Sequence, residues 1–396
     1  MSTKRLRLTA KMPKKFDFWL HLAVLILIVF GSIMILSASV GETDVDKLVT
    51  AKTAGKQIVF VVISYALMTF FANNFTMLRA KRYTKFIGFI LLGLCLATLL
   101  FPEVSGSRAW IQIPIPFVSV SLQPSEFVKV LMIVLMAITV ERTFGKNYDF
   151  WTIVKVPVVY LIAYEFVIMI LQPDFGSGVA IALICCVLFF VPSHKNLRKM
   201  QRMFAIIVLC LLAFTGFLLS DHGSAFIEHM PISEHGKDRF LAALNPFEDS
   251  FGSGYQLING LYAFSKGGLF GVGLGQSELK MSYLQAASTD YILAIVVEEL
   301  GLCGFIFFLI LYAIILSRLL YYALYAKSEG YKLLLIGNAS YLIIHFILNV
   351  GGVSGFIPLT GVPLLFMSSG GSSLMSIMIS IGISQPVISQ MRRQAE

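Results

Sequence analysis

The chain has 396 residues, of which 57% are apolar and only 13% charged, and its formal net charge is +9 at pH 7. Apolar runs of about 20 residues recur along it, which is the length a helix needs to span a bilayer, and this composition excludes an ordinary soluble domain. The basic residues lie in short connections, so we favour anchoring at the cytoplasmic face of a membrane over binding to nucleic acid. The five cysteines all fall in apolar runs, with neither metal-ligand spacing nor a disulfide framework.

Ten apolar stretches are long enough to be transmembrane helices. They lie near residues 18–40, 56–74, 85–101, 123–142, 152–171, 175–192, 202–220, 287–318, 332–350 and 363–388. Lys and Arg concentrate in alternate connections, beginning with the basic tail 1–16, which predicts that both termini are cytoplasmic. The sequence therefore predicts an all-α polytopic membrane protein in which residues 1–396 form a single transmembrane domain.

A predicted outer loop over residues 221–286 is longer than a plain connection needs, and loops of this size are usually functional. Its polar first part carries three histidines, each after an acidic residue: His222, His229 and His235. Their spacing fits no helical pair of metal ligands, so we favour a solvated loop over a metal site. The second part is rich in glycine and aromatic residues and predicts amphipathic helices at the membrane interface, Tyr255–Phe264 among them.

Arg108 is the only basic residue in the predicted outer loop after the third helix, within GSRAWIQIP. Trp110 beside it suits the level of the lipid headgroups. The guanidinium could clamp a phosphate or diphosphate in bidentate fashion. It could equally pair with an acid such as Glu103 or lie at the headgroup level, and the spacing alone leaves these alternatives open.

The motif QPSEFVK begins the fourth predicted helix. Gln123 precedes Pro124, and proline suits the first turn of a helix. Glu126 and Lys129 are three positions apart and so share one helical face. This spacing favours an internal ion pair that makes both charges tolerable in a membrane, and it is compatible with the wall of a polar cavity.

The motif QPDFGSG joins the fifth and sixth predicted helices at the outer surface. Pro173 ends the first of these helices, and Asp174 is predicted to cap the second. The backbone N–H groups at that helix terminus could also hold an anion.

Three acids lie close together in the segment 281–301: Asp290, Glu298 and Glu299. An ionisable residue within a membrane segment costs roughly 2.5–3.5 kcal/mol, so these acids are candidates for a functional site. The serine or threonine before Asp290 is predicted to cap the eighth helix, with Asp290 in its first turn at the outer boundary. Glu298 would then lie roughly 80° around the helix and about 12 Å deeper, so it could face the same cavity, whereas Glu299 would lie about 180° around.

The last part of the chain, residues 350–373, is rich in glycine and predicts an irregular connection. The run SSGGSS, which contains Gly370 and Gly371, is predicted to interrupt the last apolar helix. Non-helical backbone at membrane depth is tolerated only where protein or a water-filled cavity satisfies it.

Together these motifs resemble the shape, elongation, division and sporulation family, which includes FtsW, RodA and SpoVE. The matching pieces, in the family's order, are GSRAWI, QPSEFVK, QPDFG, NPFEDSFGSGYQ, GGLFGVGLGQS, STDYILAIVVEELG, IPLTGVPL and SGGSS. They cover the chain from about residue 106 to its end. Several long motifs in one order make a specific match.

The resemblance implies a peptidoglycan glycosyltransferase that polymerises lipid II at the outer face of the cytoplasmic membrane, beside a class B penicillin-binding protein that supplies transpeptidation. It implies that Asp290 is the essential aspartate, and we expect substrate contacts from Arg108, Glu126, Lys129 and Glu298. The other motif residues are expected to be structural: Gln123, Pro124, Asp174, Glu299, Gly370 and Gly371. The resemblance also implies dependence on Mg²⁺ or Mn²⁺. The alternatives are a lipid II flippase or other membrane transporter, and a scaffold for the partner synthase.

Four positions depart from the family's usual pattern. Gln285 stands where proline is usual, and Ser288 stands where a histidine usually precedes Thr–Asp. His345 occupies a position that is commonly glutamine, and Ser369 stands where an aromatic residue usually precedes the glycine pair. We expect these departures to affect partner choice or regulation. The segment GVGLGQS looks more like the division and sporulation branch than the elongation branch.

Overall fold

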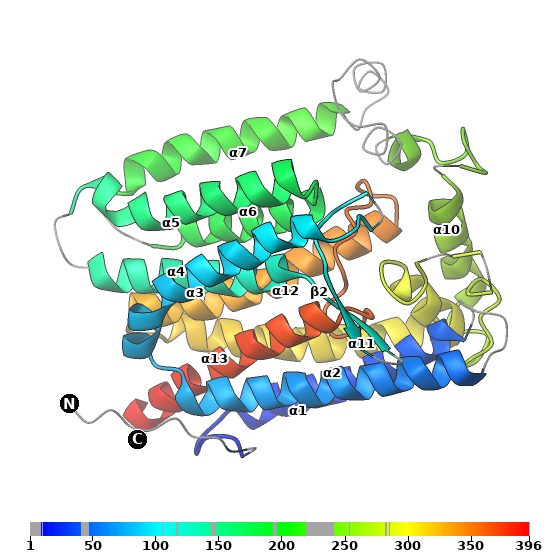
Figure 1. Cartoon of the computed structure of the whole chain (residues 1–396), viewed down its shortest axis with the longest axis horizontal. Helices are drawn as coiled ribbons and strands as arrows, with labels where there is room; N and C mark the ends of the chain where they lie inside the picture. The colour runs from blue at the N-terminus through cyan, green and yellow to red at the C-terminus, as the bar shows by residue number, and fades with distance from the viewer. Residues whose placement is uncertain are drawn as a thin grey trace.

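The chain folds into a bundle of long helices packed side by side (Figure 1). A computed structural model describes residues 9, 11–40, 47–104, 106–115, 118–143, 148–192, 196–218, 241–252, 254–281, 283–284 and 286–395. The helices of the bundle are α1 (Phe18–Ser39), α2 (Lys47–Asn74), α3 (Met77–Ala97), α4 (Pro124–Thr143), α5 (Phe150–Glu165), α6 (Phe175–Phe190), α7 (Arg198–Leu218), α11 (Ile292–Leu324), α12 (Glu329–Val353) and α13 (Gly371–Ala395). A 3₁₀ turn (Thr98–Leu100) extends α3, and a π-helical turn (Phe166–Leu171) extends α5.

Each of the ten predicted apolar stretches overlaps one of these helices in the described part of the chain. Eight of the described helices are long and apolar enough to cross a membrane. α6 is shorter, with 16 residues, and α4 carries acidic and basic residues at both ends. The predicted all-α polytopic fold is therefore confirmed.

The helices differ in how deeply they are buried. α2 lies along α13, α1 lies along α11, and α4 packs against both α3 and α12. α12 and α13 are the most buried spans, whereas α7 is mostly exposed at the edge of the bundle (Figure 1). Polar residues on α12 therefore need partners within the protein, because lipid offers none.

Residues near the two termini of the chain bond to each other at one end of the bundle. The buried carboxylate of Asp17 pairs with Arg318 at 2.6 Å and with Arg392 at 2.9 Å, and the hydroxyl of Ser389 donates to the carbonyl of Lys14 at 2.7 Å. Burial would raise the pKa of Asp17, but the hydrogen bond and charge of Arg318 hold that pKa below its usual value. The two termini share one end of the bundle; that this end is cytoplasmic stays a prediction, and the opposite end, predicted to face outward, is called the outer end below.

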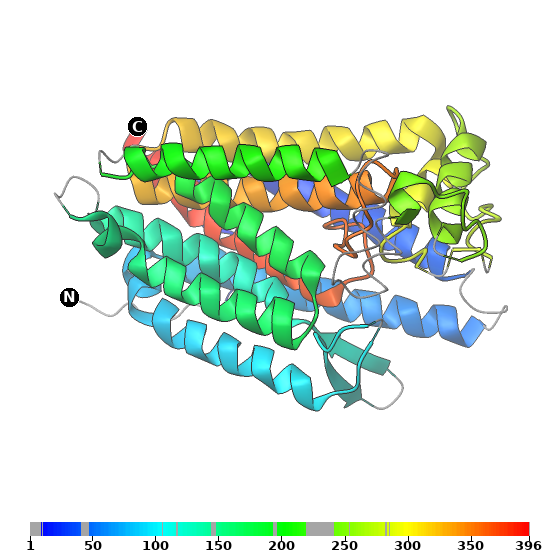
Figure 2. The same cartoon turned by 90° about the horizontal axis from the view of Figure 1, so that it is seen from above.

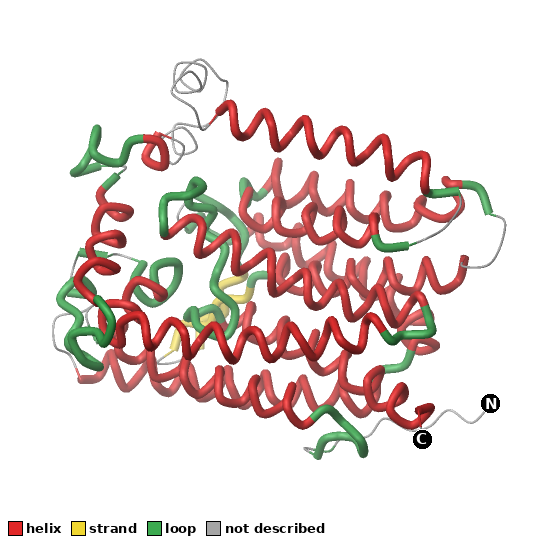
Figure 3. Tube along the Cα trace, turned by 180° about the vertical axis from the view of Figure 1, so that it is seen from behind, coloured by secondary structure: helices red, strands yellow, loops and turns green. Residues whose placement is uncertain are grey.

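Loops, strands and further helical turns gather toward the outer end, as Figure 3 shows. α10 (Tyr255–Gly267) lies there in both Figure 1 and Figure 2, so the helix predicted at Tyr255–Phe264 is confirmed. The three histidines of the long outer loop lie outside the described residues.

A β-hairpin follows α3 and was not predicted. β1 (Ile111–Ile115) pairs antiparallel with β2 (Val118–Leu122), with Ile111 opposite Leu122. A signal was present, because IQIPI and VSVSL alternate with the two-residue period of a strand. The sequence predicts only a loop here, after the third predicted helix, and the hairpin corrects that expectation.

The eighth predicted helix begins later than predicted, at Ile292 rather than near residue 287. The carbonyl of Thr289 accepts a hydrogen bond from the hydroxyl of Ser368, at 2.8 Å, and the carbonyl of Ser288 accepts one from the next backbone N–H of that segment, also at 2.8 Å. These carbonyls bond to a distant loop instead of starting a helix. The prediction that Ser288 or Thr289 caps this helix is therefore wrong.

The last helix also begins later than predicted, at Gly371 rather than near residue 363. Residues 354–370 form an irregular connection between α12 and α13, called the closing loop below. The run SSGGSS leads into α13 and does not interrupt it. The prediction of an interruption is therefore wrong.

α11 is broken at Gly301, where φ is 66° and ψ is −164°. Such a conformation is open to glycine and strained for other residues. The segment 268–273, called the inserted segment below, completes the hydrogen bonding at the break. Four backbone bonds of 2.9–3.1 Å join the two: Val272 N–H to the carbonyl of Glu298, Gly273 N–H to that of Glu299, Leu302 N–H to that of Gly268, and Cys303 N–H to that of Leu269.

Candidate functional site

Asp290 lies in a turn at the outer end, directly before α11, and is half-buried. Its backbone carbonyl accepts a hydrogen bond from Nδ2 of Asn349 at 3.0 Å. Its carboxylate adjoins Gly361, where an added Cβ would lie 3.9 Å from Oδ2. Gly361 has a φ of 70°, which favours glycine and leaves this side of the carboxylate without a side chain.

The closing loop is held beside Asp290 by two residues of α12. Nδ2 of Asn349 also donates to the carbonyl of Val362 at 3.1 Å. Nδ1 of His345 lies 3.0 Å from the carbonyl of Pro363. Asn349 was not singled out from the sequence, although its position four residues after His345 places both on one helical face.

Glu126 and Lys129 form an ion pair with 2.7 Å between Oε1 and Nζ, and their side chains are 1% and 0% exposed. We call them the buried ion pair. Nζ of Lys129 also lies 3.0 Å from Nε2 of His345, and the hydroxyl of Tyr341 donates to Oε2 of Glu126 at 2.9 Å. The internal pair favoured by the spacing is present, and its charged atoms face protein groups in this conformation.

Gln123 and Asp174 bring the first turns of α4 and α6 together. Nε2 of Gln123 donates to Oδ2 of Asp174 at 2.9 Å, while Oδ1 of Asp174 accepts from the N–H of Ser177 at 3.1 Å and so caps α6 as predicted. The backbone N–H of Gln123 donates to the hydroxyl of Ser372 at 2.8 Å. Pro124 is the first residue of α4, as predicted. These motifs therefore hold the starts of α4, α6 and α13 next to each other.

Arg108 lies before the β-hairpin, and its side chain is 54% exposed. Its Nε is 3.9 Å from a carboxylate oxygen of Glu103, and its backbone N–H donates to the carbonyl of Gln172 at 3.1 Å. An exposed pair of this kind contributes only about 0–1 kcal/mol. The guanidinium therefore remains accessible to an anionic ligand while its backbone is fixed.

Glu298 is fully buried and faces the outer loop. Its carboxylate accepts hydrogen bonds from the hydroxyl of Ser277 and, at 3.1 Å, from the backbone N–H of Glu278, and Nζ of Lys266 lies 3.5 Å away. The hydrogen bond to Glu278 raises the pKa of Lys266. The expected relation to Asp290 assumed one continuous helix through both residues. Because Asp290 precedes α11, that angular argument does not apply, and the contacts of Glu298 are separate from the buried ion pair.

Glu299 has its own partners, although it adjoins Glu298 in the chain. Its carboxylate lies 2.7 Å from Nζ of Lys280, with both side chains at most 1% exposed, and it accepts a hydrogen bond of 2.7 Å from Ser37. Lys280 was not singled out from the sequence, because nothing in its spacing connects it with α11. Each of the two adjacent carboxylates is thus neutralised by a different lysine.

The glycine pair at the start of α13 lies where helices approach closely. A Cβ on Gly371 would collide with the ring of Phe60 on α2, and a Cβ on Gly370 would collide with the hydroxyl of Ser373. Only the clash at Gly371 involves α2, so Gly371 is the residue that lets α13 begin against α2, whereas the Ser373 hydroxyl beside Gly370 belongs to α13 itself.

The described residues contain no group of three or more His, Cys, Asp or Glu side chains that could hold a metal ion. A Mg²⁺ ion bound through one or two carboxylates together with substrate phosphates does not need such a group.

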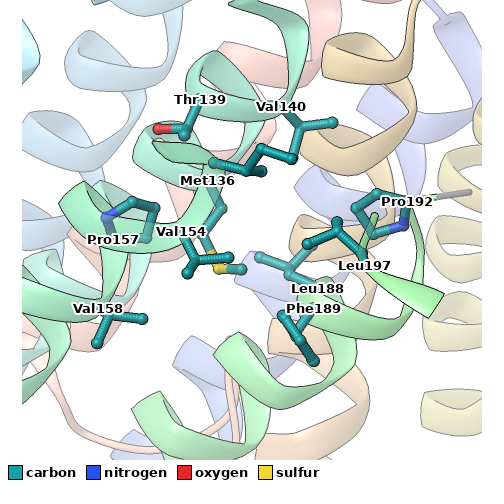
Figure 4. A pocket seen from close by; sticks show the side chains of 11 residues that line it. Met136, Thr139, Val140, Val154, Pro157, Val158, Leu188, Phe189, Pro192 and Leu197 are labelled. Carbon is teal, nitrogen blue, oxygen red and sulfur yellow. The ribbon is translucent and has the colours of Figure 1, made fainter. Parts of the chain in front are cut away.

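An apolar pocket lies between α4, α5 and α6, away from these residues (Figure 4). Met136, Val154 and Leu188 are among its lining side chains. Met136 and its neighbours lie in the second half of α4, whereas the buried ion pair lies in the first two turns. We therefore do not include this pocket in the site.

The fold and the site define an all-α, multi-pass membrane protein in which the motifs around Gln123, Asp174 and Asp290 lie at the outer end. The model of the family of cell cycle proteins FtsW, RodA and SpoVE matches residues 18–393. The chain belongs to this family, and it is a multi-pass protein of the cytoplasmic membrane.

Two relatives illustrate the similarity. The chain is 34% identical over 371 residues to stage V sporulation protein E of Bacillus subtilis (strain 168), covering 93% of this chain and 95% of that protein. It is also 34% identical over 384 residues to the probable peptidoglycan glycosyltransferase FtsW of the same organism, covering 94% of this chain and 90% of that protein.

Solved structures share the fold. A chain from a structure of a peptidoglycan synthase complex that coordinates polymerization and crosslinking has a TM-score of 0.69 at 21% identity, covering 95% of this chain and 98% of that chain. Thermus thermophilus rod shape determining protein RodA has a TM-score of 0.61 at 20% identity, covering 95% of this chain and 97% of that chain.

Proposed function

We propose that this protein polymerises lipid II into glycan strands at the outer face of the cytoplasmic membrane. Its family is that of membrane-embedded peptidoglycan glycosyltransferases, so the enzyme class follows from membership. The observation that carries the finer proposal is the position of Asp290. It is a half-buried carboxylate at the outer end, with its backbone held by Asn349 and with Gly361 beside it.

In the proposed reaction, a sugar hydroxyl of the acceptor attacks the anomeric carbon of the donor sugar. A C–O bond forms, the bond from that carbon to the diphosphate oxygen breaks, and the lipid diphosphate leaves with the electron pair. Asp290 accepts the proton of the attacking hydroxyl, or orients that hydroxyl for attack. The proton is afterwards released to water, which restores the carboxylate.

The leaving diphosphate needs positive charge near it as it departs. We propose that Arg108 supplies this charge, because its guanidinium is 54% exposed and has the planar geometry that binds phosphates in bidentate fashion. A Mg²⁺ or Mn²⁺ ion, when bound, would neutralise further charge on the diphosphate. The expected substrate contacts of Glu126, Lys129 and Glu298 would require these buried side chains to become accessible.

We further propose a class B penicillin-binding protein as the partner that crosslinks the strands. This proposal is supported by the likeness of the fold to a chain of a peptidoglycan synthase complex. Equal identity of 34% to a sporulation protein and to an FtsW supports a role in division or sporulation without separating the two.

The test is polymerisation of labelled lipid II by the purified full-length protein with its partner, across divalent ions and with EDTA. We expect Asp290→Asn to abolish polymer at normal protein level and normal partner binding. Polymer formed at the parental rate by this variant would remove Asp290 from the mechanism. Translocation of lipid II in vesicles without any polymer would instead favour the flippase alternative.

A further inference from the structure

One face of α12 carries three buried polar residues spaced four apart: Tyr341, His345 and Asn349. We call them the α12 stripe. Residues four apart lie on one side of a helix, and these three side chains are at most 1% exposed. Buried polar groups in a membrane helix require partners inside the protein, so their contacts define what the stripe does.

The deep end of the stripe contacts the buried ion pair. The hydroxyl of Tyr341 donates to Glu126 at 2.9 Å and lies 2.7 Å from the hydroxyl of Ser376. One turn further along, Nε2 of His345 lies 3.0 Å from Nζ of Lys129. Both members of the ion pair are thus tied to α12.

The outer end of the stripe contacts the backbone around Asp290. The amide nitrogen of Asn349 donates to the carbonyls of Asp290 and Val362. Carbonyl oxygens only accept hydrogen bonds, so the NH₂ group must face them and the side-chain oxygen must point away. Each amide hydrogen of Asn349 therefore holds a different segment, one at Asp290 and one at Val362.

His345 lies between the deep and outer ends of the stripe. The chemistry of its neighbours shows which of its ring nitrogens carries the proton. The carbonyl of Pro363 accepts only, so Nδ1 carries the hydrogen and donates to it at 3.0 Å. Nε2 is then the acceptor for an N–H of the Lys129 ammonium. His345 therefore acts here as one donor and one acceptor, which is also what a glutamine side chain offers.

We propose that the α12 stripe is a set of positioning residues, which transmits the geometry of the buried ion pair to the backbone that carries Asp290. This inference rests on the proposed role of Asp290. It assigns a purpose to charges that are too buried to touch substrate in this conformation. It also predicts that glutamine can replace His345, because either side chain completes the same two contacts.

The test compares variants of His345 in the full-length protein with its partner, in proteoliposomes with labelled lipid II. His345→Leu removes both contacts at similar size, and we expect kcat to fall by up to about 100-fold, as for a misplaced reacting group, with KM nearly unchanged. His345→Gln is the matched control and should retain most of the activity. Tyr341→Phe is a milder variant that keeps the ring, and we expect a smaller fall in kcat.

Hydrogen exchange of the peptide amides at 286–291 and 358–364 supplies a second readout that does not depend on activity. We expect faster exchange at both segments in His345→Leu and Tyr341→Phe, and parental exchange in His345→Gln. Parental exchange and kcat in both disrupting variants would overturn the inference. If Asp290→Asn proves active while exchange still changes as expected, the proposed role of Asp290 fails and the coupling between α12 and these segments stands.

Discussion

Replacing Lys280 by methionine removes one partner of an ion pair that is at most 1% exposed, with 2.7 Å between Nζ and Oε1 of Glu299. Methionine keeps an apolar stem of similar length, so the main change is the loss of charge. The carboxylate of Glu299 is left in the interior with the hydroxyl of Ser37 still donating to it. Breaking a buried pair from one side costs about 3–5 kcal/mol because the other charge is uncompensated, and we expect the free energy of unfolding to fall by about that amount.

The assay is denaturant titration in mixed micelles, followed by tryptophan fluorescence, for Lys280→Met, Glu299→Gln and the double variant. The double variant should recover a large part of the lost free energy of unfolding, because no unpaired charge remains in the interior. Glu103→Gln, which removes an exposed pair, is the control and should cost only about 0–1 kcal/mol. Simple addition of the two single effects in the double variant would refute the reasoning, because contacting charges must couple.

Three further variants test other parts of the fold. Because the pKa of Asp17 is lowered in the folded protein, its ion pairs stabilise the fold above the ordinary carboxyl pKa of about 4. That stability should be lost as pH falls through the folded pKa, and Asp17→Asn should flatten the acid side of a plot of melting temperature against pH. Gly301→Ala should cost about 1–3 kcal/mol from its φ of 66° alone, and more in total, because the added Cβ would collide with the backbone of Leu269 and Gly271. Gly93→Ala, with open space around it, should be neutral or stabilise α3 by about 0.5–1 kcal/mol. Thermal melting of both variants measures the difference. Asp174→Ala should lower the free energy of unfolding by about 0.5–2 kcal/mol, because it removes the α6 cap, whereas Asp174→Asn should keep most of the contribution of the cap. The same melting assay distinguishes the two variants.

Much of the fold could be predicted because the length of an apolar run and the distribution of charge along the chain are local signals. Each apolar run became a helix, and Pro124 and Asp174 begin or cap helices as their chemistry predicts. The spacing of Glu126 and Lys129 predicted an ion pair because helical neighbours three residues apart meet on any regular helix.

The predictions failed where a distant segment changes the local structure. The start of α11 was displaced because carbonyls before it bond to Ser368 and its neighbour, about 80 residues away in the chain. The partners of Glu298 and Glu299 come from Ser277 and Lys280 on a loop, and no periodic pattern connects a loop with a helix. The α12 stripe, in contrast, was visible as a regular spacing and was missed because only His345 was noted.

The break at Gly301 also has a consequence for how the chain enters the bilayer. In an unbroken helix the four backbone groups now paired with the inserted segment would pair with each other, Leu302 N–H with the carbonyl of Glu298 and Cys303 N–H with that of Glu299. α11 can therefore cross the bilayer first as a straight helix, with these groups satisfied inside the helix, and break at Gly301 only when residues 268–273 dock against it. Biogenesis of this protein should then include a step after membrane integration in which the loop docks and two helical hydrogen bonds are exchanged for four bonds to the inserted segment.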